Sequence, residues 1–372
     1  MESSIRLGSI RGIEIGVNWS WLVVFALIVW TLATAIFPDQ NPGLSDVGYA
    51  LMAVVAAVAF FASLLAHELG HAFQARREGM EIEGITLWLF GGVARFKGQF
   101  PSAGGEFRIA VAGPLVSLVI GVACVLVARA ALPTEVDGVL SWLGYINLVL
   151  LVFNLLPALP LDGGRVLRSA LWQARGDFAW ATSIAATIGR GFGYAMIAGG
   201  VFRFIFEGAF SGAWLAFIGW FLLAAAGAEQ RSLAARQALA GLRVRDVMAR
   251  EPVSVPPDLT LGRFMDEVVW ARRFTTYPVV EDGRAVGLVP FRRVAEVPRS
   301  EWDARTVREC MIPLEQVPTL RPDEPLFDAL ETLSEAPVGR GLVLDGTRLL
   351  GLLSVTDLAR ALEIGRWRRR GA

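Results

Sequence analysis

Two histidines and a glutamate are the residues in this sequence that are best placed to do chemistry. His67, Glu68 and His71 form the pattern H-E-x-x-H in an apolar stretch, and the 372 residues contain only these two histidines. Residues four apart on a helix lie on one face, so both imidazoles can bind a single zinc ion. Glu68 can then act as general base toward a water molecule. The alternative is a pair of hydrogen-bonded histidines on a buried helix.

The elements that position these residues belong to an integral membrane protein with a soluble tail. Hydrophobic residues make up 54% of the chain, and its mean hydropathy of +0.50 is above that of soluble globular proteins. The formal net charge is zero, so no nucleic-acid partner is expected. Ionisable residues within an apolar span are costly and mark function. We therefore expect the metal site inside the lipid bilayer, toward one face of it.

The distribution of basic residues predicts the topology. Arg and Lys gather in the N-terminal segment, in 74–108, in 163–175 and beyond 230, and the alternate connections contain few. By the positive-inside rule, both termini and the tail are cytoplasmic in this multi-pass cell-membrane protein. The six predicted spans are approximately 17–37, 47–73, 109–131, 140–159, 183–206 and 210–228.

A third metal ligand is needed, because catalytic zinc usually has three protein ligands. Asp162 is the best candidate, since it lies about as far along the fourth span as His67 lies along the second, at roughly 1.5 Å per residue. Pro160 and the following glycine pair predict that the helix ends here and frees the backbone to aim the carboxylate. The alternative is an ordinary helix-ending aspartate at the membrane interface. Asn154, in the same span, is expected to hydrogen-bond the scissile peptide or a neighbouring helix.

Two segments of the N-terminal half have strand patterns. Residues 3–17 predict a short strand pair at the membrane surface, and Ile85–Phe96 predicts a hairpin with its turn at Gly91–Gly92. The hairpin has two possible roles. It holds an unwound substrate by strand addition, or it is a re-entrant or interfacial loop that plugs the cavity.

These residues carry a family resemblance. H-E-L-G-H on the second span, followed by N-x-x-P-x-x-P-L-D-G-G from Asn154, resembles the site-2 protease family of intramembrane zinc metalloproteases. The resemblance implies that His67, His71 and Asp162 bind zinc and that Glu68 is the catalytic base. It also implies regulated intramembrane proteolysis of single-pass membrane substrates, such as anti-sigma factors or membrane-tethered precursors of transcription regulators. The A-G-P element at 112–114 is similar to one in this family, and we assign no role to Ser117 beyond it.

The C-terminal third contains an internal repeat. Val244–Met248 is similar to Val307–Met311, and this spacing resembles a tandem module of cystathionine β-synthase-type (CBS) domains. Such modules often bind adenine nucleotides such as ATP and AMP, which implies Ser354 and Asp357 as ribose-binding residues. The first copy has Arg293 in place of that aspartate. The alternative is a purely structural module that makes a homodimer.

The sequence thus predicts a polytopic α-helical membrane protein with a cytosolic α/β tandem CBS module. The sporulation-protease-like branch of the family has this arrangement. We predict a zinc metalloendopeptidase that is modulated by nucleotide binding. A transporter gated by the CBS pair and a catalytically inactive scaffold are the competing functions, and the intact Glu68 argues against the second. The predicted domains are a protease domain at 1–228, a helical linker at 229–241 and CBS domains at 242–300 and 301–364.

Overall fold

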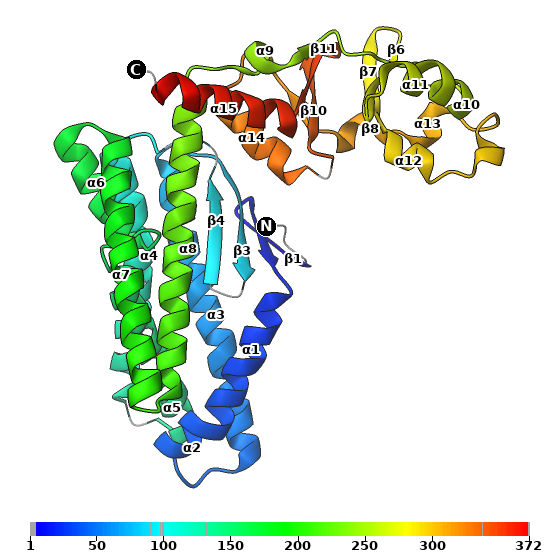
Figure 1. The fold of residues 1–372 in the computed structure, drawn as a ribbon. Helices are drawn as coiled ribbons and strands as arrows, with labels where there is room; N and C mark the ends of the chain where they lie inside the picture. The colour runs from blue at the N-terminus through cyan, green and yellow to red at the C-terminus, as the bar shows by residue number, and fades with distance from the viewer. Residues whose placement is uncertain are drawn as a thin grey trace. The chain divides into compact units, whose positions relative to one another are not determined.

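The protein is described here by a computed structural model that covers residues 5–88, 91–96, 98, 100–130, 132–336 and 338–370. It divides into two compact units, Met1–Leu233 and Ala234–Ala372, whose helices and strands are labelled in Figure 1. The first unit contains the H-E-x-x-H sequence and the second contains the internal repeat. Each unit is described by itself below.

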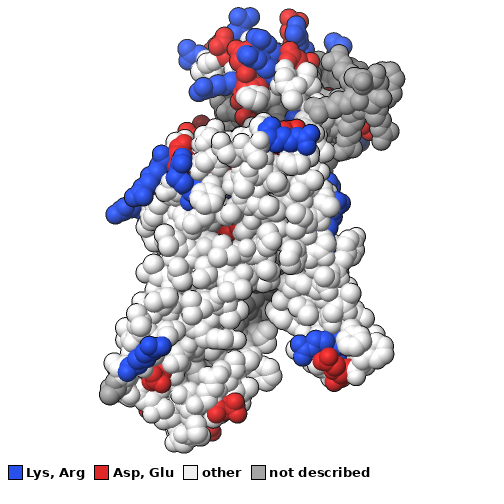
Figure 2. All heavy atoms as spheres, turned by 90° about the vertical axis from the view of Figure 1, so that its left-hand side faces the viewer, with Lys and Arg blue, Asp and Glu red and all other residues white. Residues whose placement is uncertain are grey.

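Long apolar helices build the first unit, as predicted. Five helical segments are long and apolar enough to cross a membrane, and on the face shown in Figure 2 the charged side chains gather near the ends of the helical unit. These segments confirm a multi-pass membrane protein. They are Ser20–Gln40, which comprises α1 (Ser20–Thr31), a π-helical turn (Leu32–Ile36) and α2 (Phe37–Gln40), and then α3 (Asp46–Arg77), α4 (Ala103–Ala128), α5 (Thr134–Asn154) and α8 (Phe210–Leu239).

Helix α7, Phe178–Phe206, corresponds to the predicted fifth span but is not among these five segments. Its length suffices to cross a bilayer, whereas Arg190, Arg203 and several glycines make it less apolar. It packs closely on α8, because a Cβ atom at Gly200 would lie 2.5 Å from the Gly212 carbonyl oxygen. Small residues at such a crossing are typical of helix packing in membranes. The count of six spans stays a prediction.

A four-stranded sheet lies beside the helices in the order β1-β2-β3-β4. Its N-terminal pair was predicted, but the turn of the β3–β4 hairpin was placed wrongly. Gly91 and Gly92 are paired with Trp88 and Leu87 as the first residues of β4, so they do not form the turn, and residues 89–90 lie outside the described part. Gly92 leaves room for Glu68 of α3, whereas Gly91 has a positive φ of 127° and no atom within 4 Å of its Cβ position. The strands are β1 (Ile5–Ile10), β2 (Ile13–Val17), β3 (Ile82–Trp88) and β4 (Gly91–Phe96).

Asp162 does not end the fourth span, which corrects the sequence-based picture. Helix α5 stops at Asn154, and Asp162 is the first residue of a separate helix, α6 (Asp162–Arg175). The two glycines after Asp162 lie inside α6. A Cβ atom at Gly163 would lie 2.2 Å from the Leu155 carbonyl oxygen, so these glycines let α6 pack against the connecting loop. The depth comparison assumed one continuous helix and missed this break.

The second unit is the α/β module that the repeat predicted, and its two copies exchange their first residues. Strand β5 of the first copy pairs with β11 of the second, whereas β8 of the second pairs with β7 of the first. Val244 is likewise buried among side chains of the second copy and Val307 among those of the first. The strands are β5 (Ala249–Arg250), β6 (Thr276–Glu281), β7 (Arg284–Pro290), β8 (Ile312–Pro313), β9 (Thr319–Leu320), β10 (Arg340–Asp345) and β11 (Arg348–Ser354).

Short helices cover this sheet. In the second copy, α14 packs Leu326, Ala329 and Leu333 into a core that also includes Leu358 of α15. The helices are α9 (Val244–Val247), α10 (Leu261–Arg263), a π-helical turn (Phe264–Val269), α11 (Trp270–Arg272), α12 (Phe291–Ala295), a 3-10 turn (Arg299–Glu301), α13 (Val307–Cys310), a 3-10 turn (Leu314–Gln316), α14 (Leu326–Glu335) and α15 (Val355–Arg370).

Candidate functional site

The predicted metal ligands meet inside the first unit. His67 and His71 lie one turn apart on α3, and Asp162 approaches both from the first turn of α6. The Nε2 atom of His67 lies 3.2 Å from Asp162 Oδ2, and that of His71 lies 3.3 Å from Oδ1. The two Nε2 atoms are 3.1 Å apart. All three side chains are buried, and this group could hold a metal ion.

These separations suit zinc. Ligand atoms at about 2.0–2.1 Å from a tetrahedral zinc ion lie about 3.3 Å from one another, which is close to the three distances between His67, His71 and Asp162. Two imidazoles and one carboxylate are also the donor types of catalytic zinc sites, which keep a further position for water. The donor set and its spacing therefore fit this metal.

The far nitrogens of both histidines are held in place. His71 Nδ1 lies 2.7 Å from the Ile109 carbonyl oxygen, which can only accept a hydrogen bond, so Nδ1 carries the proton and a neutral ring offers a lone pair at Nε2. His67 Nδ1 lies 2.9 Å from Ser117 Oγ. Both partners belong to α4, so this helix orients both rings. Ser117, which sequence analysis left without a role, is thus part of the site.

Gly113 of α4 leaves room for the imidazoles. A Cβ atom at this position would lie 2.2 Å from His71 Nε2 and 2.6 Å from His67 Nε2. Any larger residue would enter the space in which the ligand atoms converge. The glycine of the A-G-P element is therefore explained by the site itself, which the sequence alone does not show.

Glu68 points toward strand β4. A Cβ atom at Gly92 would lie 2.3 Å from Glu68 Cγ and 3.1 Å from its Oε1 atom, so the strand passes directly beside this carboxylate. Strand β4 is the last in the sheet order and pairs with β3 alone among the described strands. An edge strand with free backbone groups can pair with another extended segment. The hairpin is thus in a position to present a peptide to Glu68.

Asn154 lies apart from this convergence in the chain. It is the last residue of α5, eight residues before Asp162, and it is half-buried. Among the described residues, no hydrogen bond to its side chain is seen. Its predicted contact with the scissile peptide stays a prediction.

The predicted ribose-binding residues form a local contact. Asp357 Oδ2 accepts hydrogen bonds from the Ser354 hydroxyl at 2.6 Å and from the Ser354 backbone nitrogen at 3.1 Å. The Asp357 N–H donates in turn to Ser354 Oγ at 3.2 Å. This reciprocal arrangement caps the N-terminus of α15. Within the described residues, Asp357 Oδ1 takes no hydrogen bond.

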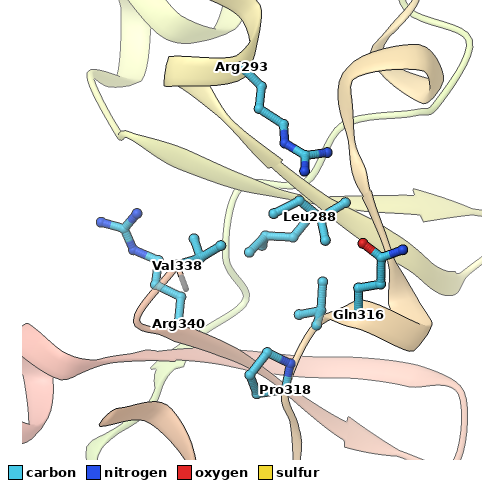
Figure 3. A pocket seen from close by; sticks show the side chains of 8 residues that line it. Leu288, Arg293, Gln316, Pro318, Val338 and Arg340 are labelled. Carbon is cyan, nitrogen blue, oxygen red and sulfur yellow. The ribbon is translucent and has the colours of Figure 1, made fainter. Parts of the chain in front are cut away.

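A pocket in the second unit is lined by both copies and contains two arginines. Arg293 points from α12 toward this pocket (Figure 3), and Arg340 also lines it. Arg293 donates to the Met311 carbonyl oxygen at 3.2 Å, and Arg340 contacts Thr275 and Thr276. The cavity volume is about 140 Å³. Ser354 and Asp357 do not line this pocket. The lining residues are Leu288, Arg293, Ile312, Gln316, Val317, Pro318, Val338 and Arg340.

Comparisons with known proteins agree with both units. The family model for peptidase family M50 matches residues 55–137 and 129–198, and the model for the CBS domain matches 244–299 and 307–364. Rip3 of Mycobacterium tuberculosis, named as a zinc metalloprotease, is 41% identical over 98% of this chain and 94% of its own length. A zinc metalloprotease of Methanocaldococcus jannaschii is 31% identical over 98% of this chain and 97% of its own length.

Among solved structures, the site-2 protease from Methanocaldococcus jannaschii is similar to this one, with 31% identity and a TM-score of 0.43 over 61% of this chain and 95% of that chain. The extent of the sequence similarity establishes the family. This chain belongs to peptidase family M50, the site-2 proteases, and is a zinc metalloprotease with a tandem CBS module. The transporter and the inactive scaffold are therefore not needed to explain it.

Proposed function

We propose that this metalloprotease is an endopeptidase in which His67, His71 and Asp162 hold zinc and Glu68 is the catalytic base. The observation that carries this proposal is the convergence of lone pairs. With Nδ1 of His71 donating to a carbonyl, its Nε2 atom faces His67 Nε2 and the Asp162 carboxylate at hydrogen-bond distance. Acceptors crowd together in a buried space only if a cation or an added proton lies among them.

The proposed chemistry divides the work between ligands and base. Zinc, when bound, polarises a carbonyl group and makes a water molecule more acidic. Glu68 takes the proton from the attacking water and returns it to the nitrogen of the leaving amine. Ser117 and the Ile109 carbonyl hold the two rings so that Nε2 of each faces the reacting centre. The burial of the ligands excludes bulk water from this space.

The substrate is proposed to bind as an extended segment. A helical peptide bond is shielded by its own hydrogen bonds, so a membrane-spanning substrate must unwind before it is cut. Strand addition to the free edge of β4 would satisfy the backbone of the unwound segment. Because Gly92 lies against Glu68, such a segment would pass next to the base. Asn154 is proposed as a further partner of the scissile peptide.

The biological role proposed is regulated intramembrane proteolysis. The substrates would be single-pass membrane proteins, such as anti-sigma factors or membrane-tethered precursors of transcription regulators. Both termini and the CBS domains are proposed to be cytoplasmic, with a protease domain at 1–228, a linker at 229–241 and CBS domains at 242–300 and 301–364. A homodimer through the CBS domains is part of the same proposal.

A modulating role for the CBS pair is proposed from its residues. Asp357 Oδ1 remains available to a ribose hydroxyl, and the Arg293 guanidinium can meet a phosphate in the pocket. The cavity of about 140 Å³ is smaller than the roughly 300–1,000 Å³ of ordinary ligand sites. Binding of a whole nucleotide would therefore separate the pocket walls. Because the pocket walls belong to both copies, their separation would change how the two copies are arranged.

Two experiments test these proposals. In the first, membrane proteomes of cells with wild-type and Glu68→Gln protein are compared, and Glu81→Gln, an exposed glutamate, is the control. Uncut single-pass proteins should accumulate only in Glu68→Gln; identical proteomes would contradict the protease role.

In the second experiment, calorimetry with ATP and AMP on the full chain compares Arg293→Ala with Arg292→Ala. Only the first should weaken binding, by about tenfold for one lost charge-assisted contact.

A further inference from the structure

A buried arginine lies close to the metal site without belonging to it. The Arg168 side chain, on α6, is only 2% exposed. Its guanidinium donates to Glu106 of α4 at 2.7 Å and to Glu229 of α8 at 2.5 Å. It also lies over the rings of Phe100 and Phe178, at 5.7 Å and 4.9 Å from their centroids. Burial of an arginine in this way is costly unless its partners are fixed.

Helix α6 links this arginine to the proposed ligand. Asp162 is the first residue of the helix and Arg168 comes six residues later, about 9 Å along its axis. A helix this short moves as a rigid body, because its internal hydrogen bonds resist bending. Gly163 packs on the loop after α5 at one end. Arg168 holds the middle of the helix, so the two contacts together fix where Asp162 points.

The two carboxylates that hold Arg168 differ in exposure. The Glu106 side chain is fully buried, whereas that of Glu229 is 39% exposed. Glu229 belongs to α8, and this helix continues past Leu233 into the second unit and ends at Leu239. A displacement of α8 would therefore break the Glu229 contact first. Arg168 would keep Glu106 as its counter-charge, so the loosened state would remain folded.

We propose that Arg168 is a positioning residue for the metal site. Because Arg168 contacts Glu229, a displacement of α8 would change the orientation of Asp162. The inference rests on the proposed role of Asp162 as a ligand. The CBS pair can act on catalysis by this route. A shift of α8 loosens the packing of α6, and α6 carries Asp162, one of the three proposed ligands. The outcome is a change in metal retention and turnover.

The test measures zinc release from the full-length protein in detergent, with a chromogenic chelator as the trap. Glu229→Gln keeps the shape of the side chain and removes its charge. We expect zinc to leave roughly tenfold faster in this variant, within the range typical of coupled sites. Glu207→Gln is the matched control, because Glu207 forms an exposed pair with Arg203 on α7. Equal release from wild type and Glu229→Gln would overturn the proposal.

A second comparison separates positioning from simple stability. The variant Arg168→Lys keeps the charge but loses the planar fork that reaches two carboxylates. The double variant, Glu106→Gln combined with Arg168→Gln, removes both charges of the buried pair. Both should release zinc faster and lower kcat with little change in KM. A lower Tm with wild-type zinc release would mean a structural role only and would also overturn the proposal. A wild-type protein that binds no zinc would instead contradict the proposed ligands.

Discussion

Two aspartates, each in the first turn of a helix, show how differently a motif carboxylate can be used. Asp162 begins α6 and directs both oxygens at histidines that lie some 90 residues earlier in the chain. Asp357, in the first turn of α15, uses Oδ2 for its own turn through Ser354. These hydrogen bonds to Ser354 explain the position of Asp357 as that of a helix cap. Among the described residues, Asp162 makes no such bond within its own turn, which agrees with its proposed role as a metal ligand.

The same contrast extends to the surroundings of the two residues. The imidazoles that Asp162 meets are oriented by two groups on α4, and Gly113 leaves space among them. Among the described residues, the hydrogen bonds of Asp357 are to Ser354 alone. A site that several distant elements build together is sensitive to substitution in each of them. A local cap is sensitive only to its own residues, and the predictions below use that difference.

The largest effect is expected at Gly113. Replacement by alanine would put a methyl group within 2.2 Å of His71 Nε2, and the ligands would have to separate. We expect zinc affinity to fall by about 100-fold, the upper end of the losses seen when groups that orient metal ligands are changed. Equilibrium dialysis against a zinc buffer measures this. Gly191→Ala is the control, since no atom lies within 4 Å of its Cβ position. Stoichiometric zinc in Gly113→Ala would show that the ligands do not converge here.

Removal of the Ser117 hydroxyl should have a smaller effect. In Ser117→Ala, the His67 ring loses the partner of Nδ1 at 2.9 Å and gains rotational freedom. Zinc affinity should fall by about 10–100-fold, as for other groups that orient a ligand. Ser63→Ala is matched to it, because the Ser63 hydroxyl donates only to the Phe60 carbonyl of its own helix. Equal zinc affinities in the two variants would remove Ser117 from the site.

The smallest effect is expected at Asp357. Its replacement by alanine removes a helix cap and should cost the module about 1 kcal/mol of unfolding free energy, with zinc content unchanged. Asp357→Glu, which retains a capping carboxylate, should recover most of that loss. Thermal unfolding of the full chain, followed by zinc analysis, checks both. Unchanged stability in Asp357→Ala, or a loss of zinc from it, would contradict the contrast with Asp162.

The sequence was informative where the chemistry lay within one element. H-E-x-x-H carries its own geometry on a helix, and the repeat reveals the CBS pair because its two copies share a pattern. The turn at Gly91–Gly92 was predicted wrongly, because a glycine pair satisfies a turn and a close approach equally well. Only the structure shows that Glu68 lies beside Gly92. The break between Asn154 and Asp162 was missed because residues 155–159 are apolar and continue the hydrophobic pattern of α5.

Apart from the approach of Asp162 to the two histidines, contacts between distant elements could not be predicted from one sequence. Ser117 looks like any small residue on an apolar helix, and its importance appears only when α4 packs on α3. Arg168 looks like one more basic residue on the cytoplasmic side of a span, and so contributes only to the topology. Its burial between Glu106 and Glu229 depends on three helices that lie far apart in the chain.

The central claim is that three residues hold the metal and a fourth moves the proton. The measurement that tests it most directly is zinc content together with peptide cleavage in purified Glu68→Gln and Asp162→Ala. The account predicts about one zinc per chain and no cleavage in Glu68→Gln, because the ligands are intact and the base is lost. It predicts loss of both in Asp162→Ala, because two imidazoles alone hold zinc weakly. Full zinc in Asp162→Ala, or normal cleavage by Glu68→Gln, would contradict the account.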